Sequence, residues 1–398
     1  MGGGFLRFGW SLALMLGLPL LAQAQSAPSV DWSLRLNEPI YNAPQSMDGH
    51  VYLTSLQDDG PNVFAIDGKA KKLLWSYATQ GSIAIPPTVG GTQLFVASDV
   101  GETHFMRTLN ALTGKLIWEY RRAQPPECMC SYQSTLTGGL LFAQTDGHSL
   151  FAFQPQGNVP SRRLWSFNGD GALLTAPVTA DGIVVIGSSD RTLYGLDAKT
   201  GKSLWQQTTG YAFTAAPVIA GDVVVIGDQG GNMEGFALKT GALLWSATAG
   251  GAIDNAAVIA DQKAFIVSED HNLYALNLSN GQIAWQYQMQ DEAQYAPVVS
   301  GHRVIVGDRS GELTGLDESQ GKVLWRTALA DAPLSAPLLW NLDQRVALKI
   351  GDHIIAAYNT QSGKLLWHYQ TQDVVTLPVV VDKDIVFATN KGLVVALR

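Results

Sequence analysis

The sequence predicts an all-β protein, a closed β-propeller built from short antiparallel strands. Three observations support this fold class: a ten-residue segment recurs along most of the chain, tryptophan recurs at a nearly constant interval, and helix signals are nearly absent. The recurring segment is clearest at Leu196–Trp205, which reads LDAKTGKSLW. Its near-copies are Leu109–Trp118 (LNALTGKLIW), Phe236–Trp245 (FALKTGALLW), Leu276–Trp285 (LNLSNGQIAW), Leu316–Trp325 (LDESQGKVLW) and Tyr358–Trp367 (YNTQSGKLLW).

Each copy reads as a tight turn between two strands. Asp or Asn opens the turn because its side chain hydrogen-bonds its own backbone, and glycine fits the position with positive φ. In Leu196–Trp205 these roles fall to Asp197 and Gly201. The apolar residues that end in Trp205 then start the next strand, so each copy is a hairpin with a large aromatic anchor.

The tryptophans give the period of the repeat. Successive members of the series are separated by 43, 43, 47, 40, 40, 40, 40 and 42 residues. An interval of roughly 40–45 residues that contains four short strands is typical of propeller blades. We expect each of these residues to be a structural anchor. The anchors are Trp32, Trp75, Trp118, Trp165, Trp205, Trp245, Trp285, Trp325 and Trp367.

The two ends of the repeat array complement each other. Asp31–Leu36 is a lone strand that carries the first periodic tryptophan, with no group of strands before it. At the other end, Leu377–Val381, Ile385–Thr389 and Leu393–Leu397 are three strands with no tryptophan strand after them. We therefore expect the N-terminal strand to complete the last blade, which closes the ring and leaves only short, protected edges.

The number of blades stays open between eight and nine. Three strands precede the tryptophan strand of each repeat, and counting these groups of three along the chain gives nine. Propellers, however, typically have four to eight blades. Two groups are irregular: the first contains a long acidic stretch, Leu56–Asn62, and the third has Gln154–Arg163 where the turn motif belongs. Either the ring has nine blades or one of these groups is not a complete blade.

The N-terminus is expected to be an export signal. Arg7 supplies a positive charge, Ser11–Leu21 is an apolar segment of signal-peptide length, and Ala22-Gln23-Ala24 is a small-x-small cleavage site. The predicted organisation is a signal peptide at 1–24, a short leader at 25–30 and a propeller at 31–398. An uncleaved membrane anchor is the weaker alternative, because the apolar segment is shorter than a membrane span.

The composition and net charge indicate a folded domain that is not expected to bind nucleic acid. Of the 398 residues, 46% are hydrophobic and 15% are charged, which fits a soluble globular domain rather than a disordered chain. The net charge is −8, and no cluster of Lys and Arg stands out, so nucleic acid is not expected to bind. No transmembrane segment is expected after signal cleavage, and we expect a monomer.

The repeats resemble those of the quinoprotein, or PQQ-like, β-propeller superfamily, over about residues 31–398. Within that superfamily the chain is most similar to the BamB-type scaffold proteins of outer-membrane assembly. The resemblance implies a non-catalytic periplasmic scaffold that binds periplasmic or outer-membrane proteins. The chain departs from those lipid-anchored proteins because no cysteine follows its apolar signal segment. The alternative implied by the superfamily is a PQQ-binding quinoprotein oxidoreductase or its periplasmic accessory protein.

A quinone site would require several carboxylates and an amide oxygen for Ca²⁺, together with basic side chains for the cofactor. At the aligned positions expected to line the channel mouth, Asp254 and Asn255 stand alone. One carboxylate and one amide do not make such a site. We therefore expect no catalytic, cofactor-binding or metal-binding residues, and no cofactor.

Two further groups of residues, the cysteines and the histidines, could carry chemistry. Cys128 and Cys130, separated by Met129, are interpreted as a small structural disulfide, as expected in an oxidising exported compartment. The alternatives are a redox-active disulfide or a Cu(I) site made by two thiolates and a thioether. The seven histidines show no metal-binding spacing and are expected to lie on the surface.

Overall fold

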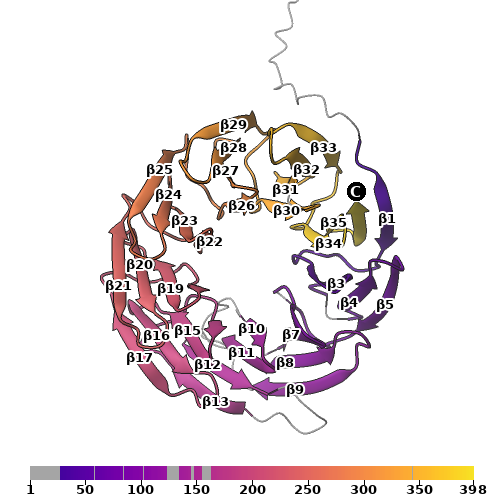
Figure 1. Cartoon of the computed structure of the whole chain (residues 1–398). Coiled ribbons are helices and arrows are strands. Elements are labelled where there is room, and N and C mark those ends of the chain that lie inside the picture. Colours follow the sequence, from indigo (N-terminus) through magenta and orange to yellow (C-terminus); the bar gives the residue numbers. More distant parts are fainter. Residues whose placement is uncertain are drawn as a thin grey trace, which may run out of the picture.

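In the computed structural model, nine sheets surround a common axis and form a closed ring (Figure 1). The structure describes residues 27–57, 59–83, 85–101, 103–122, 134–144, 148–154, 163–342 and 344–398. Within these ranges the chain forms strands and no helix, and every sheet has four strands. The predicted all-β propeller is confirmed with nine blades. The predicted signal peptide, residues 1–24, lies outside the described residues.

The first three blades include both groups that left the count open. Blade 1 consists of β2 (Gln45–Met47), β3 (His50–Thr54), β4 (Val63–Asp67) and β5 (Lys72–Tyr77). Blade 2 consists of β6 (Thr88–Gly90), β7 (Gln93–Val100), β8 (Thr103–Asn110) and β9 (Leu116–Arg122). Blade 3 consists of β10 (Ser134–Thr137), β11 (Leu140–Gln144), β12 (Ser149–Phe153) and β13 (Arg163–Asn168). Both irregular groups are complete four-stranded sheets.

The next three blades are the most regular. Blade 4 consists of β14 (Val178–Ala180), β15 (Ile183–Gly187), β16 (Thr192–Asp197) and β17 (Ser203–Thr208). Blade 5 consists of β18 (Val218–Ala220), β19 (Val223–Gly227), β20 (Asn232–Ala237) and β21 (Leu243–Thr248). Blade 6 consists of β22 (Val258–Ala260), β23 (Lys263–Val267), β24 (Asn272–Asn277) and β25 (Ile283–Gln288).

The last three blades end at the C-terminus. Blade 7 consists of β26 (Val298–Ser300), β27 (Arg303–Gly307), β28 (Glu312–Asp317) and β29 (Val323–Ala328). Blade 8 consists of β30 (Leu338–Trp340), β31 (Arg345–Ile350), β32 (Ile354–Asn359) and β33 (Leu365–Gln370). Blade 9 consists of β34 (Val379–Val381), β35 (Asp384–Ala388), β36 (Leu393–Leu397) and β1 (Val30–Arg35).

Strand β1 closes the ring, as the sequence predicted. It pairs antiparallel with β36, with Trp32 opposite Ala396 and Arg35 opposite Leu393. Beside this pair, Asp31 Oδ2 lies 3.0 Å from Lys71 Nζ of blade 1. The terminal strands therefore complete blade 9 and are also joined by an ion pair to the blade that follows.

The apolar core is divided among the seams between blades. Nine clusters of buried side chains are present in the described part of the chain, and each draws its members from two neighbouring blades. The first strand of each blade lies nearest the axis and the last lies on the rim (Figure 1). Each blade therefore buries its two faces against its neighbours, and stability depends on nearest-neighbour interfaces.

The repeated turn has the predicted geometry. In blade 4, Asp197 Oδ1 accepts hydrogen bonds from the backbone N–H of Lys199 (3.1 Å) and Thr200 (2.7 Å). Gly201 has a φ of 69°, the left-handed conformation that glycine adopts without strain. The same conformation recurs at the equivalent glycines of blades 5, 6, 7 and 8.

Six of the periodic tryptophans join their blade to the next through the indole N–H. Trp205 Nε1 of blade 4 donates to the carbonyl of Leu238 in the turn of blade 5 (2.8 Å), and Trp245 Nε1 repeats this contact with Leu278 of blade 6. Equivalent bonds start at Trp75, Trp165, Trp285 and Trp325. The rings also lie on the turn glycines, since a Cβ at Gly241 would stand 2.6 Å from Trp205.

Replacing a turn glycine should separate two costs, backbone strain and loss of the seam contact. Gly182→Ala adds a Cβ at φ +76° with nothing within 4 Å, so we expect a loss of about 1–2 kcal/mol from strain alone. Gly241→Ala carries the same strain and also displaces Trp205, so its loss should exceed that of Gly182→Ala by about 1–3 kcal/mol. Urea unfolding of both variants measures the difference, and equal losses would contradict the seam contact.

Candidate functional site

The ring presents two kinds of loop on its two faces. Because the strands of each blade are antiparallel, the turns after the first and third strands lie on one face, which we call the hairpin face. The connections after the second and fourth strands lie on the other, which we call the connection face. Asp254 and Asn255, singled out in the sequence, lie on the connection face between β21 and β22.

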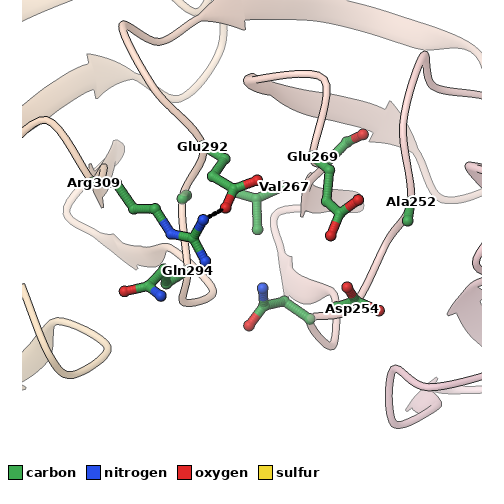
Figure 2. Close-up of a pocket in the computed structure, with 10 residues that line it drawn as sticks. Ala252, Asp254, Val267, Glu269, Glu292, Gln294 and Arg309 are labelled. Atoms are coloured by element: carbon green, nitrogen blue, oxygen red, sulfur yellow. Dashed lines mark ion pairs between the residues drawn. The ribbon is translucent and has the colours of Figure 1, made fainter.

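Asp254 and Asn255 line a pocket on the connection face. The pocket has a volume of about 120 Å³ and lies over blades 6 and 7. Its lining combines two connections after outermost strands with two loops after second strands (Figure 2). The lining residues are Ala252, Asp254, Asn255, Val267, Ser268, Glu269, Glu292, Ala293, Gln294 and Arg309.

Arg309 holds one side of the pocket together. Its guanidinium forms an ion pair with Glu292 (Figure 2). The amide oxygen of Gln294, in the orientation that satisfies both ends of the amide, accepts from Arg309 Nη2 (3.0 Å) and Nε (3.1 Å). The carboxylate of Glu292 and the amide of Gln294 are therefore already paired with a cation of the protein itself.

Asp254 is held on the other side of the pocket. Its Oδ1 accepts from Thr214 Oγ1 (2.7 Å) and from Gln229 Nε2. Gln229 Nε2 also donates to Thr214 Oγ1 (2.8 Å). Asp254 therefore belongs to a small polar network between the loops of blades 5 and 6.

The repeats that build this site match one family model. Its description is "Outer membrane protein assembly factor BamB", and it matches residues 29–163, 137–255, 236–297 and 269–398. Together the matched parts extend over all nine blades. The chain belongs to this family.

Individual relatives agree with the family. Over 119 residues the chain is 30% identical to the outer membrane protein assembly factor BamB of Nitrosomonas eutropha, which spans 30% of this chain and only 26% of that relative. The crystal structure of BamB from Moraxella catarrhalis superposes with a TM-score of 0.60 at 16% identity, covering 94% of this chain and 100% of that one. At this identity the superposition shows a common fold alone.

The same fold is shared with an enzyme. A quinohemoprotein alcohol dehydrogenase from Pseudomonas putida HK5 superposes with a TM-score of 0.57 at 14% identity, covering 94% of this chain and 78% of that one. Fold therefore does not separate a scaffold from a quinone-dependent enzyme. Whether this chain can bind a quinone cofactor has to be judged from the residues of the pocket.

The pocket residues do not fit PQQ with Ca²⁺. A volume of about 120 Å³ is well below the roughly 300–1,000 Å³ typical of pockets that enclose a cofactor-sized ligand. Ca²⁺ requires six to eight converging oxygen ligands. Within the described ranges, the pocket carboxylates Asp254, Glu269 and Glu292 are not brought close enough to form a ligand group.

The sequence pointed to part of this pocket and missed the rest. Asp254 and Asn255 were recognised from the connections that precede the first strand of each blade. Glu269 and Arg309 were missed because they lie on the loops between second and third strands. Aligning the residue that follows the buried Ser268 and Asp308 would have shown that this loop position changes from blade to blade.

Two other sequence predictions remain as they were. Cys128 and Cys130 lie outside the described residues, so the disulfide interpretation stays a prediction. No helix able to span a bilayer is present in the ranges that the structure describes.

A half-buried carboxyl lies away from the pocket, in the seam between blades 4 and 5. Glu234 on β20 is paired with Ile226 across the sheet, and it replaces the tyrosines that blades 4 and 6 place there, Tyr194 and Tyr274. Burial, reinforced by the negative charge of Asp228, raises the pKa of Glu234 to about 7. We assign it to the seam rather than to a binding site.

The raised pKa of Glu234 predicts a pH-dependent gain from Glu234→Gln. In the unfolded chain the pKa of a glutamate is about 4.3, so above that pH folding requires Glu234 either to take up a proton or to bury its charge. Glu234 therefore lowers the free energy of unfolding increasingly as the pH rises towards 7. The variant should melt at a higher temperature than the parent at pH 8, with the gain vanishing near pH 4. Thermal melts at both pH values measure this, and a gain independent of pH would contradict it.

Proposed function

We propose that the protein is a non-catalytic scaffold of the periplasm that binds partner proteins in outer-membrane protein assembly. The observation that carries the proposal is the family match, which extends over all nine blades rather than over a few repeats. The predicted signal peptide at 1–24 supports export, and the poor fit of the pocket to a quinone supports a role without a cofactor. We propose a monomer whose partners are periplasmic or outer-membrane proteins.

The rim of the ring offers a surface for protein contacts. Each outermost strand from β5 to β33 contains a bulge directly before its tryptophan, for example between the pairs Gly195–Trp205 and Leu196–Ser203, which leaves Leu204 unpaired. In these eight strands the bulged residue is apolar, whereas in β1 of blade 9 it is Asp31. These residues are Leu74, Ile117, Leu164, Leu204, Leu244, Ala284, Leu324 and Leu366.

The bulge turns apolar side chains towards solvent. Leu204, Leu244 and Leu324 are 50%, 50% and 48% exposed, while the tryptophans that follow them are buried. Bulges re-aim side chains in this way, and apolar groups repeated along an exposed surface are typical of protein contact sites. The outermost strands also have one unpaired edge, to which an extended client segment can add as a further strand.

A scaffold that uses its rim should lose its partners when the rim becomes charged. We expect the double variant Leu204→Asp, Leu244→Asp to recover at least about tenfold less partner protein than the parent in crosslinked pull-downs from intact cells. Gln206→Asp with Ser246→Asp is the matched control, because these exposed residues lie two positions further along the same strands, β17 and β21. Equal recovery by the two double variants would place the contacts elsewhere.

A quinone test separates the scaffold from the enzyme. Adding PQQ and Ca²⁺ to the purified protein should leave its visible spectrum and melting temperature unchanged, because the pocket is too small and its carboxylates do not converge. A purified quinoprotein dehydrogenase stripped of its cofactor serves as the positive control. A shift in absorbance together with a rise in melting temperature would overturn the non-catalytic assignment.

A further inference from the structure

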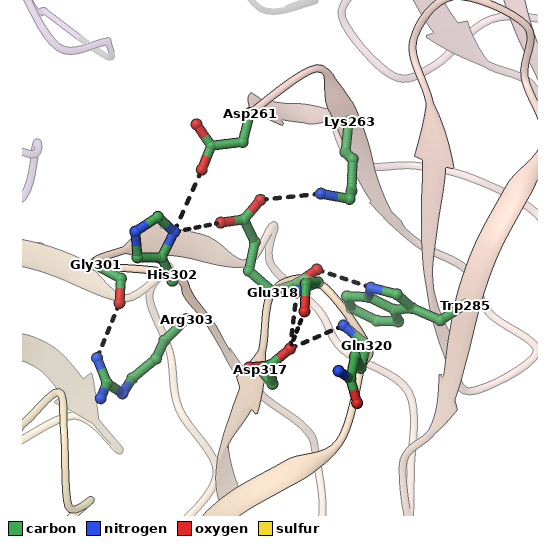
Figure 3. A network of polar contacts seen from close by, with 10 residues as sticks. Asp261, Lys263, Trp285, Gly301, His302, Arg303, Asp317, Glu318 and Gln320 are labelled. Carbon is green, nitrogen blue, oxygen red and sulfur yellow. Dashed lines mark hydrogen bonds and ion pairs between the residues drawn. The ribbon is translucent and has the colours of Figure 1, made fainter.

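On the hairpin face, three loops bring an imidazole and two carboxylates together at the seam between blades 6 and 7 (Figure 3). Asp261 lies between β22 and β23, His302 between β26 and β27, and Glu318 directly after β28. One donor atom from each of the three lies within 4.8 Å of the other two. In the described part of the chain, no other group of three such side chains converges in this way.

The distances from the His302 imidazole to the two carboxylates fit a shared metal ion better than direct hydrogen bonds. His302 Nδ1 lies 3.7 Å from Asp261 Oδ2 and 3.6 Å from Glu318 Oε2, which is longer than the 2.7–3.2 Å of an N–H···O hydrogen bond. Zinc binds nitrogen and oxygen ligands at about 2.0–2.2 Å with tetrahedral angles, which places its ligand atoms about 3.3–3.6 Å apart. The two carboxylate donor atoms lie within 4.8 Å of each other, so an inward movement of about 1 Å brings all three atoms to one ion.

Glu318 departs from the repeat at this point. The equivalent turn positions of the other described blades hold small or apolar side chains, at Gly68, Ala111, Ala198, Leu238, Leu278 and Thr360. The side chain of Glu318 is only 3% exposed, and a buried carboxylate is costly unless its charge is compensated. Lys263 Nζ lies 3.4 Å from Oε1, while the other oxygen, Oε2, faces His302 (Figure 3).

Backbone hydrogen bonds hold two of the three loops in place before any ligand binds. The N–H of Glu318 donates to the carbonyl of His302 (3.0 Å). The carbonyl of Glu318 accepts from Trp285 Nε1 (2.8 Å), which is the seam contact common to the blades. Two of the three donor residues are thus joined to each other and to the core, and a fixed donor set loses less entropy when it binds an ion.

The geometry points to a zinc site made by Asp261 Oδ2, His302 Nδ1 and Glu318 Oε2, which joins blades 6 and 7. A neutral imidazole with two carboxylates is a donor set that suits zinc better than Ca²⁺ or Mg²⁺, which take oxygen ligands. The two carboxylates balance the charge of the ion. His302 and Asp261 have 88% and 63% of their side chains exposed, so water can occupy the fourth position. This site is independent of the proposed scaffold role.

Zinc titration of the untagged mature protein tests the site. We expect one equivalent of Zn²⁺ to bind by calorimetry and to raise the melting temperature, with Ca²⁺ doing neither. His302→Ala and Glu318→Gln should each weaken zinc binding at least about tenfold. His353→Ala is the matched control, because His353 is an exposed histidine on the opposite face, and it should leave zinc binding unchanged.

His302→Ala keeps the test sharp if Glu318→Gln disturbs the fold, because the His302 side chain is exposed and its loss leaves the seam packing in place. Zinc affinity that is the same in the parent and in His302→Ala would overturn the site. So would a Ca²⁺ response equal to the zinc response, since that would indicate binding by carboxylates alone.

Discussion

The ring depends on one contact, repeated from blade to blade, between a tryptophan and the turn of the next blade. A buried indole N–H needs an acceptor, and the acceptor is a turn carbonyl such as that of Leu238 for Trp205. The indole ring of Trp205 also needs a flat surface to pack on, and Gly241 offers one because it has no Cβ. The turn glycine therefore serves two purposes, the left-handed backbone and the close approach of the neighbouring blade. The residue that forms the turn and the residue that lets the next blade pack closely are therefore the same glycine.

Most of the fold could be predicted from the sequence because this requirement is local and repeats. Asp197 and Gly201 are four residues apart, so the turn is visible in one short segment, and its period gives the blades. The count of nine could not be settled in advance, because the first group contains the long acidic stretch Leu56–Asn62 and the third has Gln154–Arg163 where the turn motif belongs. The partner of each indole was also hidden, since Trp205 and Leu238 are 33 positions apart in the chain. That contact depends on how blades stack, which a single repeat does not encode.

The site residues were harder to predict for the same reason. Asp254 was recognised because it breaks the pattern at an aligned position, whereas its partners Thr214 and Gln229 come from the preceding blade. Asp261 and Glu318 are far apart in sequence and meet only because two hairpins of one blade face a hairpin of another. Residues that depart from the repeat are visible in the sequence. Which of these residues contact one another depends on how neighbouring blades pack, and this is not visible there.

The closing strand makes the completeness of the chain part of the fold. Strand β1 is the first strand of the propeller in chain order, yet its partner β36 is the last. Trp367, on the last strand of blade 8, has no acceptor for its Nε1 among the described residues, and blade 9 has no turn that joins β36 to β1. Until the last residues emerge, blade 9 lacks its inner three strands and the apolar faces of blades 1 and 8 have no neighbour. A prematurely terminated chain is therefore an open ring with two apolar ends, which quality-control proteases and chaperones can distinguish from the finished protein.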